Sequence, residues 1–514
     1  MAFPVPVAVT TAAQMEEFDS LIIVSTNIGC QYNDQLDKQI KEFAKTDLRI
    51  GAEIVYLHCN DAPGGRLILS PAGDLSKDFA DVRNFGDAAK KAIEVAKNAG
   101  SIKPAILLEG APQLPEYQNA LSVAYLSSCQ ALWKPLEARE VIGESKLEPI
   151  KQIGLVDVDD KVDCQYLTAL ESGRRLARDL CGTEPERMAP PKFAEYCEQA
   201  FEGSKVSVTV ESSKDTLENE YPLLAAVARA SQSVTRHQPR VIHLTYEGEG
   251  PIEQTVMLVG KAVTYDTGGA DLKVGGHMAG MSRDKGGAAA VAGFMQTLAK
   301  LQPKGIKVVA GIGAVRNSIG ADAYVADEII TAHSGKRVRI GNTDAEGRLV
   351  MCDLLSHMRA NAKNETNPQL FTVATLTGHA ALTAGPYTLY VDNGPSRQNR
   401  TGAVLAEVGD LWGDCGETSR SRKEDWNIIK NRSEADDVLS SNNGPSVSVA
   451  RGHQFPMAFL SLAAGLDDHG QYSDQPIPYC HIDIAGSGVE SGDWQHDKPT
   501  AAPLIALAGK YLAK

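Results

Sequence analysis

The segment "GNTDAEGRLV", residues 341–350, stands where a β-rich stretch gives way to a helix. Asp344 and Glu346 are two residues apart, and such residues point to the same side of an extended backbone, whereas on a helix they diverge by about 200°. The pattern therefore predicts that the two carboxylates converge on a common partner. Taken alone, the decapeptide fits a plain helix start equally well, with a polar residue as the cap and acids interacting with the helix dipole.

Strand-like and helix-like segments alternate on both sides of this stretch. The strand-like segments are "EQTVMLVGKAVTYD" (253–266), "GIKVVAGIGAV" (305–315) and "LFTVATLTG" (370–378), and the helix-like ones are "GGAAAVAGFMQTLAKL" (286–301) and "GRLVMCDLLSHMRANAK" (347–363). This alternation predicts a mainly parallel central sheet covered by helices, with ligands at the carboxyl ends of the strands.

The first 150 residues show the same alternation on a smaller scale and predict a compact α/β domain. A leucine-rich helix over 164–181 is followed by the connector "GTEPERMAPP", which contains Gly and three prolines and is typical of a domain joint. We therefore expect an α/β protein of two domains: a smaller N-terminal α/β domain (1–160), a linker helix and connector (161–190) and a larger C-terminal domain (191–514).

Composition limits the possible partners and location. Hydrophobic residues make up 43% and charged residues 23% of the 514, which is typical of a globular protein with a sizeable core. The net charge of -14 argues against a nucleic-acid partner. No apolar run is long enough for a membrane span, so no membrane association is expected. No Lys or Arg precedes Lys38, as a targeting segment would require, so we expect a cytoplasmic location. The nine cysteines form no C-x-x-C pair and indicate reduced, mostly buried thiols.

Residues 260–287, "GKAVTYDTGGADLKVGGHMAGMSRDKGG", supply further charged residues next to glycines. These residues are Lys261, Asp266, Lys273 and Asp284. Together with Asp344 and Glu346 they give four carboxylates at strand or loop ends, which would repel one another and have raised pKa values unless cations lie among them. A pair of divalent ions that clamps a water against a polarised carbonyl or phosphoryl group would satisfy them. The oxygen-rich ligand set leaves zinc, manganese, cobalt and magnesium open.

Each of these residues also has an ordinary structural explanation. Asp266 fits a turn and Asp284 a helix N-cap, and the two lysines fit surface or charge-partner roles. Arg348 follows Glu346 on the first helical turn, where the helix dipole disfavours a cation, and its planar fork suits a carboxylate-shaped anion. The isolated histidines His277, His379 and His481 are expected in core or surface roles. Dinucleotide, phosphate-loop, H-E-x-x-H and G-x-S-x-G motifs are absent from the sequence.

In combination, the motifs resemble the leucyl aminopeptidase family (cytosol aminopeptidase), which are two-metal exopeptidases. "NTDAEGRL" carries the resemblance, and "VGKAVTYDTGG", "DLK", "RDKGGAAAV", "ATLTG" and "HIDIAG" occur in the family's order over residues 259–486. The resemblance implies a metal-dependent hydrolase that cleaves the N-terminal residue, leucine or another neutral residue, from peptides through a water bridged by two metals. It also implies peptide substrates with a free N-terminus and a homohexamer.

The resemblance further implies a role for each matching residue. One metal would be bound by Lys261, Asp266, Asp284 and Glu346, and a more exchangeable one by Asp266, Asp344 and Glu346. Zinc is the expected metal for the two divalent ions, and manganese, cobalt or magnesium could replace it at the exchangeable position. Lys273 would stabilise the oxyanion, and Arg348 would hold a bicarbonate that acts as general base. The substrate would be bound by Met281, Thr375, Leu376, Gly378, Ala485 and Gly488.

Two departures from the family pattern affect substrate preference. Arg316 stands where the family usually has Glu, and the loop 431–455 differs in composition from typical members. Gly488 falls where leucine-preferring members can carry a bulky apolar side chain, so broad acceptance of neutral side chains is expected unless a neighbour from that loop fills the gap. Two other functions stay open: a catalytically inactive, aminopeptidase-like paralogue with a structural or binding role, and a phosphoesterase that uses the same carboxylates.

Overall fold

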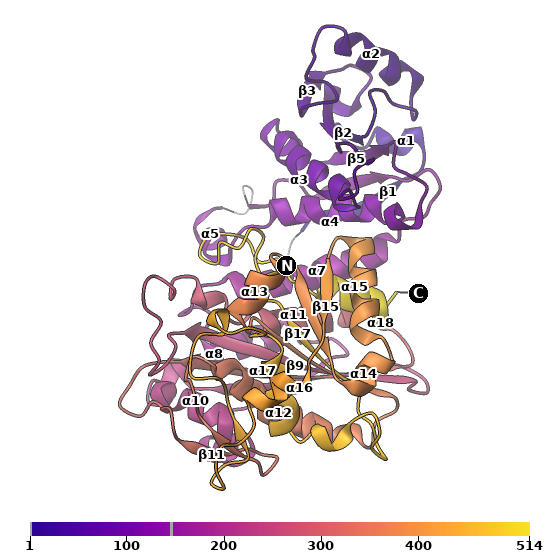
Figure 1. The fold of residues 1–514 in the computed structure, drawn as a ribbon. Helices are drawn as coiled ribbons and strands as arrows, with labels where there is room; N and C mark the ends of the chain where they lie inside the picture. The colour runs from indigo at the N-terminus through magenta and orange to yellow at the C-terminus, as the bar shows by residue number, and fades with distance from the viewer. Residues whose placement is uncertain (1–2, 144–146, 514) are drawn as a thin grey trace. The chain divides into compact units, whose positions relative to one another are not determined.

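The computed structural model describes residues 3–143 and 147–513. The chain forms two compact units, one of residues 1–175 with 407–415 and one of residues 176–406 with 416–514 (Figure 1). The division falls inside helix α7 (Cys164–Gly182), which coincides with the helix expected over 164–181.

The smaller unit is built on a six-stranded sheet in the order β1-β6-β5-β2-β4-β3, parallel except for the β3–β4 pair. Its strands are β1 (Val5–Val9), β2 (Ser20–Ser25), β3 (Val55–His58), β4 (Arg66–Pro71), β5 (Pro104–Glu109) and β6 (Gln152–Val156). Its helices are α1 (Ala12–Met15), α2 (Asp34–Ala44), α3 (Arg83–Asn98), α4 (Ala120–Leu132) and α5 (Leu136–Val141). Helix α3 buries a face rich in alanine, and such small side chains let a helix lie close to its neighbours.

The larger unit is built on an eight-stranded sheet in the order β15-β14-β17-β13-β9-β10-β8-β7. Its strands are β7 (Ser207–Glu211), β8 (Arg240–Glu247), β9 (Gln254–Asp266), β10 (Ile306–Asn317), β13 (Pro368–Ala374), β14 (Thr388–Asp392), β15 (Gly416–Ser419) and β17 (Tyr479–Asp483). The central strands β10, β9, β13 and β17 are parallel, and antiparallel pairs lie toward both edges. The expected α/β fold with a mainly parallel central sheet is confirmed. A small sheet of β11 (Ile329–Thr331), β12 (Arg337–Arg339) and β16 (Val438–Leu439) is added beside it.

Helices cover the large sheet because its central strands are apolar along their length. Strand β9 is almost entirely buried, as a parallel strand covered on both faces must be. Helices α10, α12 and α17 share one core with this sheet, and α11 packs against β9, β13, α8 and α18. The helices of this unit are α8 (Pro190–Phe201), α9 (Lys214–Glu220), α10 (Pro222–Gln232), α11 (Gly286–Leu301), α12 (Glu346–Ala362), α13 (Gly378–Ala384), α14 (Gly394–Gln398), α15 (Thr401–Trp412, whose end belongs to the smaller unit), α16 (Lys423–Ile428), α17 (Phe455–Ala463) and α18 (Leu504–Tyr511).

Two glycines let helices approach the central strands closely. A Cβ atom on Gly287, in the first turn of α11, would lie 2.0 Å from the Val373 carbonyl oxygen on β13. A Cβ atom on Gly347, in the first turn of α12, would lie 2.6 Å from Cε of Lys261. Both contacts would be steric clashes, so glycine at these positions brings the helix starts onto the carboxyl ends of the strands.

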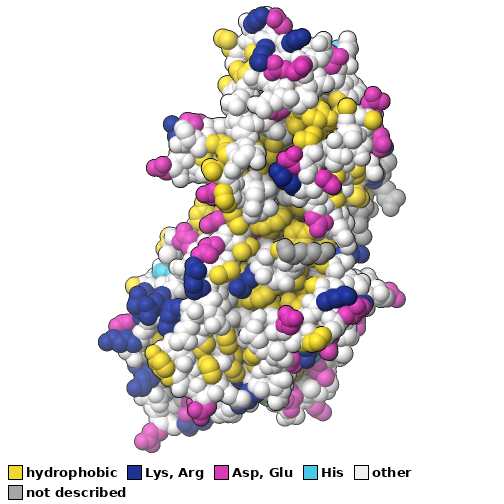
Figure 2. All heavy atoms as spheres, turned by 90° about the vertical axis from the view of Figure 1, so that its right-hand side faces the viewer, with side chains coloured by type: hydrophobic (Ala, Val, Ile, Leu, Met, Phe, Trp, Pro, Cys, Tyr) yellow, Lys and Arg dark blue, Asp and Glu magenta, His cyan; other side chains and the backbone are white. Residues whose placement is uncertain are grey.

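The surface and the thiols agree with a folded, reduced chain. On the face in Figure 2, acidic, basic and apolar side chains are intermixed. All nine cysteines are free thiols and most are buried, as expected. Within residues 3–143 and 147–513, no helix is both long and apolar enough to cross a membrane.

Candidate active site

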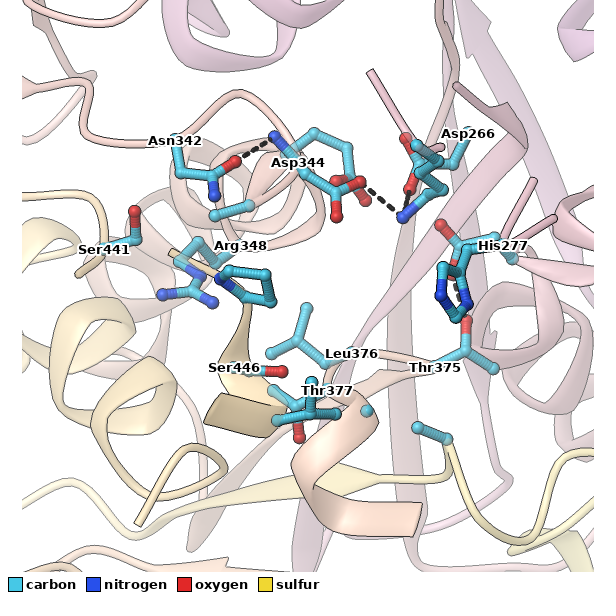
Figure 3. A pocket seen from close by; sticks show the side chains of 18 of the residues that line it. Asp266, His277, Asn342, Asp344, Arg348, Thr375, Leu376, Thr377, Ser441 and Ser446 are labelled. Carbon is cyan, nitrogen blue, oxygen red and sulfur yellow. Dashed lines mark hydrogen bonds and ion pairs between the residues drawn. The ribbon is translucent and has the colours of Figure 1, made fainter. Parts of the chain in front are cut away.

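A cavity in the larger unit opens where β9, β13 and β17 end and α12 begins (Figure 3). The side chains that line it include every predicted site residue except Gly488. Those residues are Lys261, Asp266, Lys273, Met281, Asp284, Asp344, Glu346, Arg348, Thr375, Leu376, Gly378 and Ala485. The fold therefore gathers segments up to about two hundred residues apart at one edge of the sheet, as expected for the carboxyl ends of parallel strands.

Lys261 lies at the buried end of the cavity. Its Nζ is 2.8 Å from Asp284 Oδ2 and 2.9 Å from Glu346 Oε1, and it donates a hydrogen bond of 3.0 Å to the Thr375 carbonyl oxygen. The Thr375 hydroxyl in turn donates to Asp284 Oδ1 at 2.7 Å. The lysine and two of the predicted metal ligands thus form one buried cluster.

Lys273 lies closer to the opening and pairs with the other two carboxylates. Its Nζ is 2.9 Å from Asp266 Oδ2 and makes a shorter contact with Asp344 Oδ1. Asp266 is held in place by Asn317, whose side-chain amide donates a 2.8 Å hydrogen bond, and by the backbone N–H of Gly268 at 2.9 Å. Asn317, at the end of β10, is a positioning residue that the sequence pattern did not indicate.

Electrostatics in the cavity favour cations. Burial raises the pKa of Asp344 to about 7, with Asp266 and Glu346 adding to the shift, and burial also raises the pKa of Asp284 well above its ordinary value. Burial alone would lower the pKa of Lys261, but nearby Asp284 and Glu346 outweigh it and hold that pKa above its usual value. With all four carboxylates ionised and both lysines protonated, two negative charges would be unbalanced, and cations among them would stabilise the ionised carboxylates.

The donor set fits divalent metal ions. One carboxylate oxygen from each of Asp266, Asp284 and Glu346 lies within 4.8 Å of the others, and all three residues are buried. Glu346 Oε2 is buried without a hydrogen-bond partner in the described chain. A buried carboxylate oxygen without a partner is costly, and a cation beside it would remove that cost.

Arg348 is buried in the first turn of α12, on the opposite side of the cavity from Asp266 (Figure 3). It donates a 2.9 Å hydrogen bond to the Ser440 carbonyl oxygen, and its guanidinium lies 5.3 Å from the ring centre of Phe455. Burial lowers its pKa to about 10, and its Nε has no hydrogen-bond partner among the described residues. The guanidinium therefore lines the cavity with one buried N–H that no described residue accepts.

Segments on both sides of the cavity complete its walls. The loop 431–455 contributes one wall, which consists of Ser441, Asn442, Gly444, Pro445, Ser446 and Val447. A Cβ atom on Gly378 would lie 2.7 Å from Val447 Cγ1, so this loop packs directly onto the start of α13. This loop therefore forms part of the surface that a ligand would meet.

Gly488 lies outside the cavity lining, and its nearest neighbour is the Ile484 carbonyl oxygen, 3.1 Å from where a Cβ atom would lie. A Cβ atom on Gly488 would lie 3.6 Å from Trp494 Cη2 and 3.5 Å from Thr375 Cγ2. Trp494 itself lines the cavity. The gap expected at Gly488 is thus bordered by an aromatic ring from the segment that follows "HIDIAG", and this ring was not identified from the sequence.

Other residues singled out in the sequence have these surroundings. Arg316 pairs with Glu186, 3.0 Å between Nη1 and Oε1, and lies over the ring of Tyr265. His277 is exposed at the cavity, and His481 is buried in β17, where its Nδ1 is 2.8 Å from the Thr372 hydroxyl. Nearby, Asp483 accepts hydrogen bonds from the backbone N–H groups of Leu376 and Ala485 and so orients the segment after β13.

Comparison with known proteins gives an independent view of the same chain. The catalytic-domain model of the cytosol aminopeptidase family matches residues 175–508. A Caenorhabditis elegans relative named "Putative aminopeptidase W07G4.4" is 41% identical over 493 residues, which are 96% of this chain and 92% of the relative. A "Probable cytosol aminopeptidase" of Wolinella succinogenes is 31% identical over 330 residues, 64% of this chain and 62% of the relative.

Solved structures share the fold at low sequence identity. A mutant of tomato leucine aminopeptidase has a TM-score of 0.78 at 21% identity and covers 99% of this chain and 96% of its own. The bottromycin maturation enzyme BotP, in a complex with Mn, has a TM-score of 0.72 at 19% identity, and the match covers 96% of this chain and 98% of BotP. The likeness extends over both units, and together with the family model and the relatives it confirms the resemblance inferred from the sequence motifs: this chain belongs to the cytosol aminopeptidase family.

Proposed function

We propose that this protein is a dinuclear metallo-aminopeptidase that removes leucine and other neutral residues from the N-terminus of peptides. One observation carries the proposal: the cavity brings Asp266, Asp284, Asp344 and Glu346 together with two lysines, and a buried oxygen of Glu346 has no partner among the residues that the structure describes. Membership of the family supports peptide hydrolysis over a phosphoesterase reaction.

The ligand sets follow the grouping of the side chains. Lys261, Asp266, Asp284 and Glu346 would hold one ion, and Asp266, Asp344 and Glu346 the other, with zinc as our first choice. Manganese, cobalt or magnesium would also suit the second position, and the manganese complex of the structural neighbour BotP favours testing manganese. Bound there, two divalent ions would polarise the scissile carbonyl and lower the pKa of a shared water.

The side chains of this chain would then divide the remaining work. Lys261 would bind as the neutral amine, because a dication nearby lowers the pKa of an ammonium group. Lys273 would stay protonated. Metal ions would replace it beside Asp266 and Asp344, and its ammonium group would donate a hydrogen bond to the substrate oxygen that becomes negative in the transition state. Arg348 would hold a bicarbonate through its free N–H, and this anion would take the proton from the attacking water.

Substrate selection would come from the shape and charge of the cavity. Met281, Leu376 and Ala485 offer apolar surface for the first side chain, and the carboxylates would attract the free amino group and repel acidic side chains. Trp494 would limit the depth of the pocket. We also propose a cytoplasmic homohexamer, in line with the family pattern and with relatives named cytosol aminopeptidases.

Paired substrates test the proposal. Leucine amide should be hydrolysed by the metal-loaded protein, N-acetylated leucine amide should not, and a strong chelator should abolish the hydrolysis until zinc, manganese or cobalt is returned. Equal rates on the free and acetylated amides would refute an aminopeptidase. No hydrolysis of any free-amine aminoacyl amide with each of these metals would favour the alternative, a catalytically inactive paralogue with a structural or binding role.

A further inference from the structure

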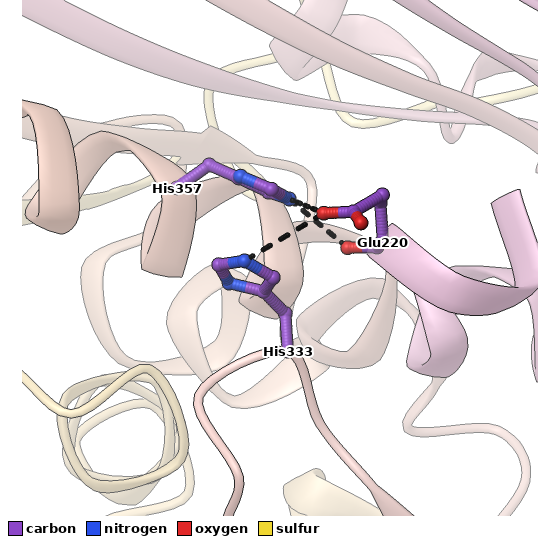
Figure 4. Close-up of side chains that lie close together, drawn as sticks. All are labelled: Glu220, His333 and His357. Carbon is purple, nitrogen blue, oxygen red and sulfur yellow. Dashed lines mark hydrogen bonds and ion pairs between the residues drawn. The ribbon is translucent and has the colours of Figure 1, made fainter. Parts of the chain in front are cut away.

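A second group of potential metal ligands lies in the larger unit, outside the cavity. Glu220 is the last residue of α9, His333 lies between β11 and β12, and His357 is on α12. In Figure 4 both imidazole rings point toward the carboxylate of Glu220. One ligand atom from each of the three residues lies within 4.8 Å of the other two.

The distances are close to those of a coordinated ion. Nε2 of His333 is 3.9 Å and Nε2 of His357 is 3.7 Å from Oε2 of Glu220. Two ligand atoms that each lie about 2.0–2.1 Å from a tetrahedral zinc ion are roughly 3.4 Å apart. Movements of a few tenths of an ångström would therefore bring both pairs to coordination distance.

Neighbouring groups hold the two rings in a stacked arrangement, which would have to open for both Nε2 atoms to converge on one ion. The rings are stacked, with centroids 3.6 Å apart and planes at 24°, and Nδ1 of His333 is 3.0 Å from the hydroxyl of Ser356. With Nδ1–H donating to that hydroxyl, the lone pair of His333 is on Nε2, which faces Glu220. Nε2 of His357 is 3.0 Å from the Glu220 carbonyl oxygen, so its proton would shift to Nδ1 when Nε2 binds a cation.

The backbone around this cluster is also fixed. The buried carboxylate of Asp353, on α12, accepts hydrogen bonds from the backbone N–H of His333 at 2.9 Å and of Leu223 at 2.8 Å. It therefore joins the β11–β12 turn and α10, which begins two residues after Glu220, to α12 without any ion. Fixing part of a ligand set in advance lowers the entropy that is lost when an ion binds.

Charge and protonation are also suitable. Across residues 3–143 and 147–513, the recorded ion pairs of Glu220 are those with the two histidines. Burial lowers the pKa of His333, with His357 adding to the shift and Glu220 opposing it. The side chain of Glu220 is 51% exposed, which leaves room for a water as fourth ligand.

We propose that Glu220, His333 and His357 bind a zinc ion outside the cavity, where it would take no part in the peptidase reaction. Two imidazoles and one carboxylate are a ligand set typical of zinc, whereas the cavity offers mainly carboxylates. His357 follows Glu346 by 11 residues on α12, which places the two sites about 16 Å apart along the helix axis. The ion would tie α9 and the β11–β12 turn to the helix that carries Glu346 and Arg348.

Zinc content tests the proposal without relying on activity. The full-length protein and the variants His357→Gln, Glu220→Gln and His58→Gln would be equilibrated at the same buffered free zinc concentration, and zinc per chain would be measured by mass spectrometry. His357→Gln and Glu220→Gln should each hold one zinc fewer than wild type, while His58→Gln, which removes an exposed histidine of the smaller unit, should match wild type. Equal zinc content in all four proteins would overturn the proposal.

Two further measurements keep the result interpretable. Added zinc should raise the melting temperature of His357→Gln and Glu220→Gln less than that of wild type and His58→Gln. The zinc affinity of this site should fall by about a hundredfold or more in the first two variants, because even the loss of an outer hydrogen-bonding partner lowers metal affinity 10–100-fold. Peptidase turnover of the variants should stay near that of wild type. If His357→Gln fails to fold, as judged by circular dichroism, the exposed Glu220→Gln decides, and unchanged zinc binding in that variant would refute the site.

Discussion

Among single residues, the two lysines of the cavity differ in what surrounds them. The Lys261 side chain is 3% exposed and contacts a carbonyl oxygen as well as two carboxylates, whereas the Lys273 side chain is 15% exposed. Under the proposed function, Lys261 would therefore belong to the buried ligand set, and Lys273 would face a bound substrate.

This difference leads to a prediction for Lys273. Lys273→Ala should lower turnover by about 10² or more, the usual scale for the loss of one oxyanion stabiliser, and should leave metal content near that of wild type. Turnover and metal content would be measured on the same preparation. Arg348→Ala should lower turnover less if water replaces the anion, and loss of metal in the Lys273 variant would show that this lysine acts on metal binding instead.

Trp494 gives a second prediction at this scale. Its ring borders the space beside Gly488, so Trp494→Ala should enlarge the pocket and raise kcat/KM for phenylalanine and tryptophan substrates relative to leucine. One methylene group of extra room is worth about 1–3 kcal/mol, which corresponds to a change of tenfold or more in that ratio.

A matched variant separates the two sides of this contact. Gly488→Met would place a side chain against the same ring, so it should narrow the pocket while Trp494 is present and restore leucine preference in the Trp494→Ala background. An unchanged aromatic-to-leucine ratio in both single variants would show that the first side chain of the substrate binds elsewhere.

At the level of secondary structure elements, α12 connects several features of the larger unit. It carries Glu346 and Arg348 in its first turn, Asp353 in its middle and His357 beyond it. The sequence could predict its start, because the polar turn before Glu346 and the apolar period after it are local signals. It could not indicate the cluster with Glu220 and His333, since those residues come from distant segments without a characteristic spacing.

Strand β17 offers a prediction about acid stability. Burial lowers the pKa of His481 to about 3, and Arg348 and His453 add to the shift. The histidine of the unfolded state has a pKa of about 6.5, so the unfolded state takes up this proton at a higher pH than the folded state. The free energy of unfolding is therefore unaffected by this group above about pH 6.5 and falls as the pH drops from about 6.5 toward 3. Each pKa unit between the two states corresponds to about 1.4 kcal/mol.

The variant His481→Asn tests this contribution because asparagine does not titrate and can still reach the Thr372 hydroxyl. Its urea midpoint should be lower than that of wild type at pH 7, because a buried ring is lost, but should fall less between pH 7 and pH 4.5. His58→Asn, on the surface, should show the wild-type pH dependence. Parallel pH dependence for wild type and His481→Asn would contradict the assignment.

At the level of the whole molecule, local patterns and long-range contacts contribute different parts of the result. The α/β class, the parallel centre of the large sheet and the gathering of the charged motifs at strand ends follow from periodicity and from the rule for parallel sheets. The assignment of residues 407–415 to the smaller unit, the position of Trp494 and the role of Asn317 depend on contacts between distant segments. No local pattern encodes such contacts, so a single sequence does not reveal them.

The central claim is that Asp266, Asp284, Asp344 and Glu346 hold two divalent ions side by side and that peptide cleavage depends on both. Manganese tests this claim directly, because two Mn²⁺ ions about 3.5–4 Å apart give an exchange-coupled electron paramagnetic resonance spectrum. In a titration of metal-free protein, the coupled signal and leucine amide hydrolysis should rise together, and both should be lost in Asp344→Asn. Full activity without metal, or activity that saturates while only isolated Mn²⁺ signals are present, would contradict the account.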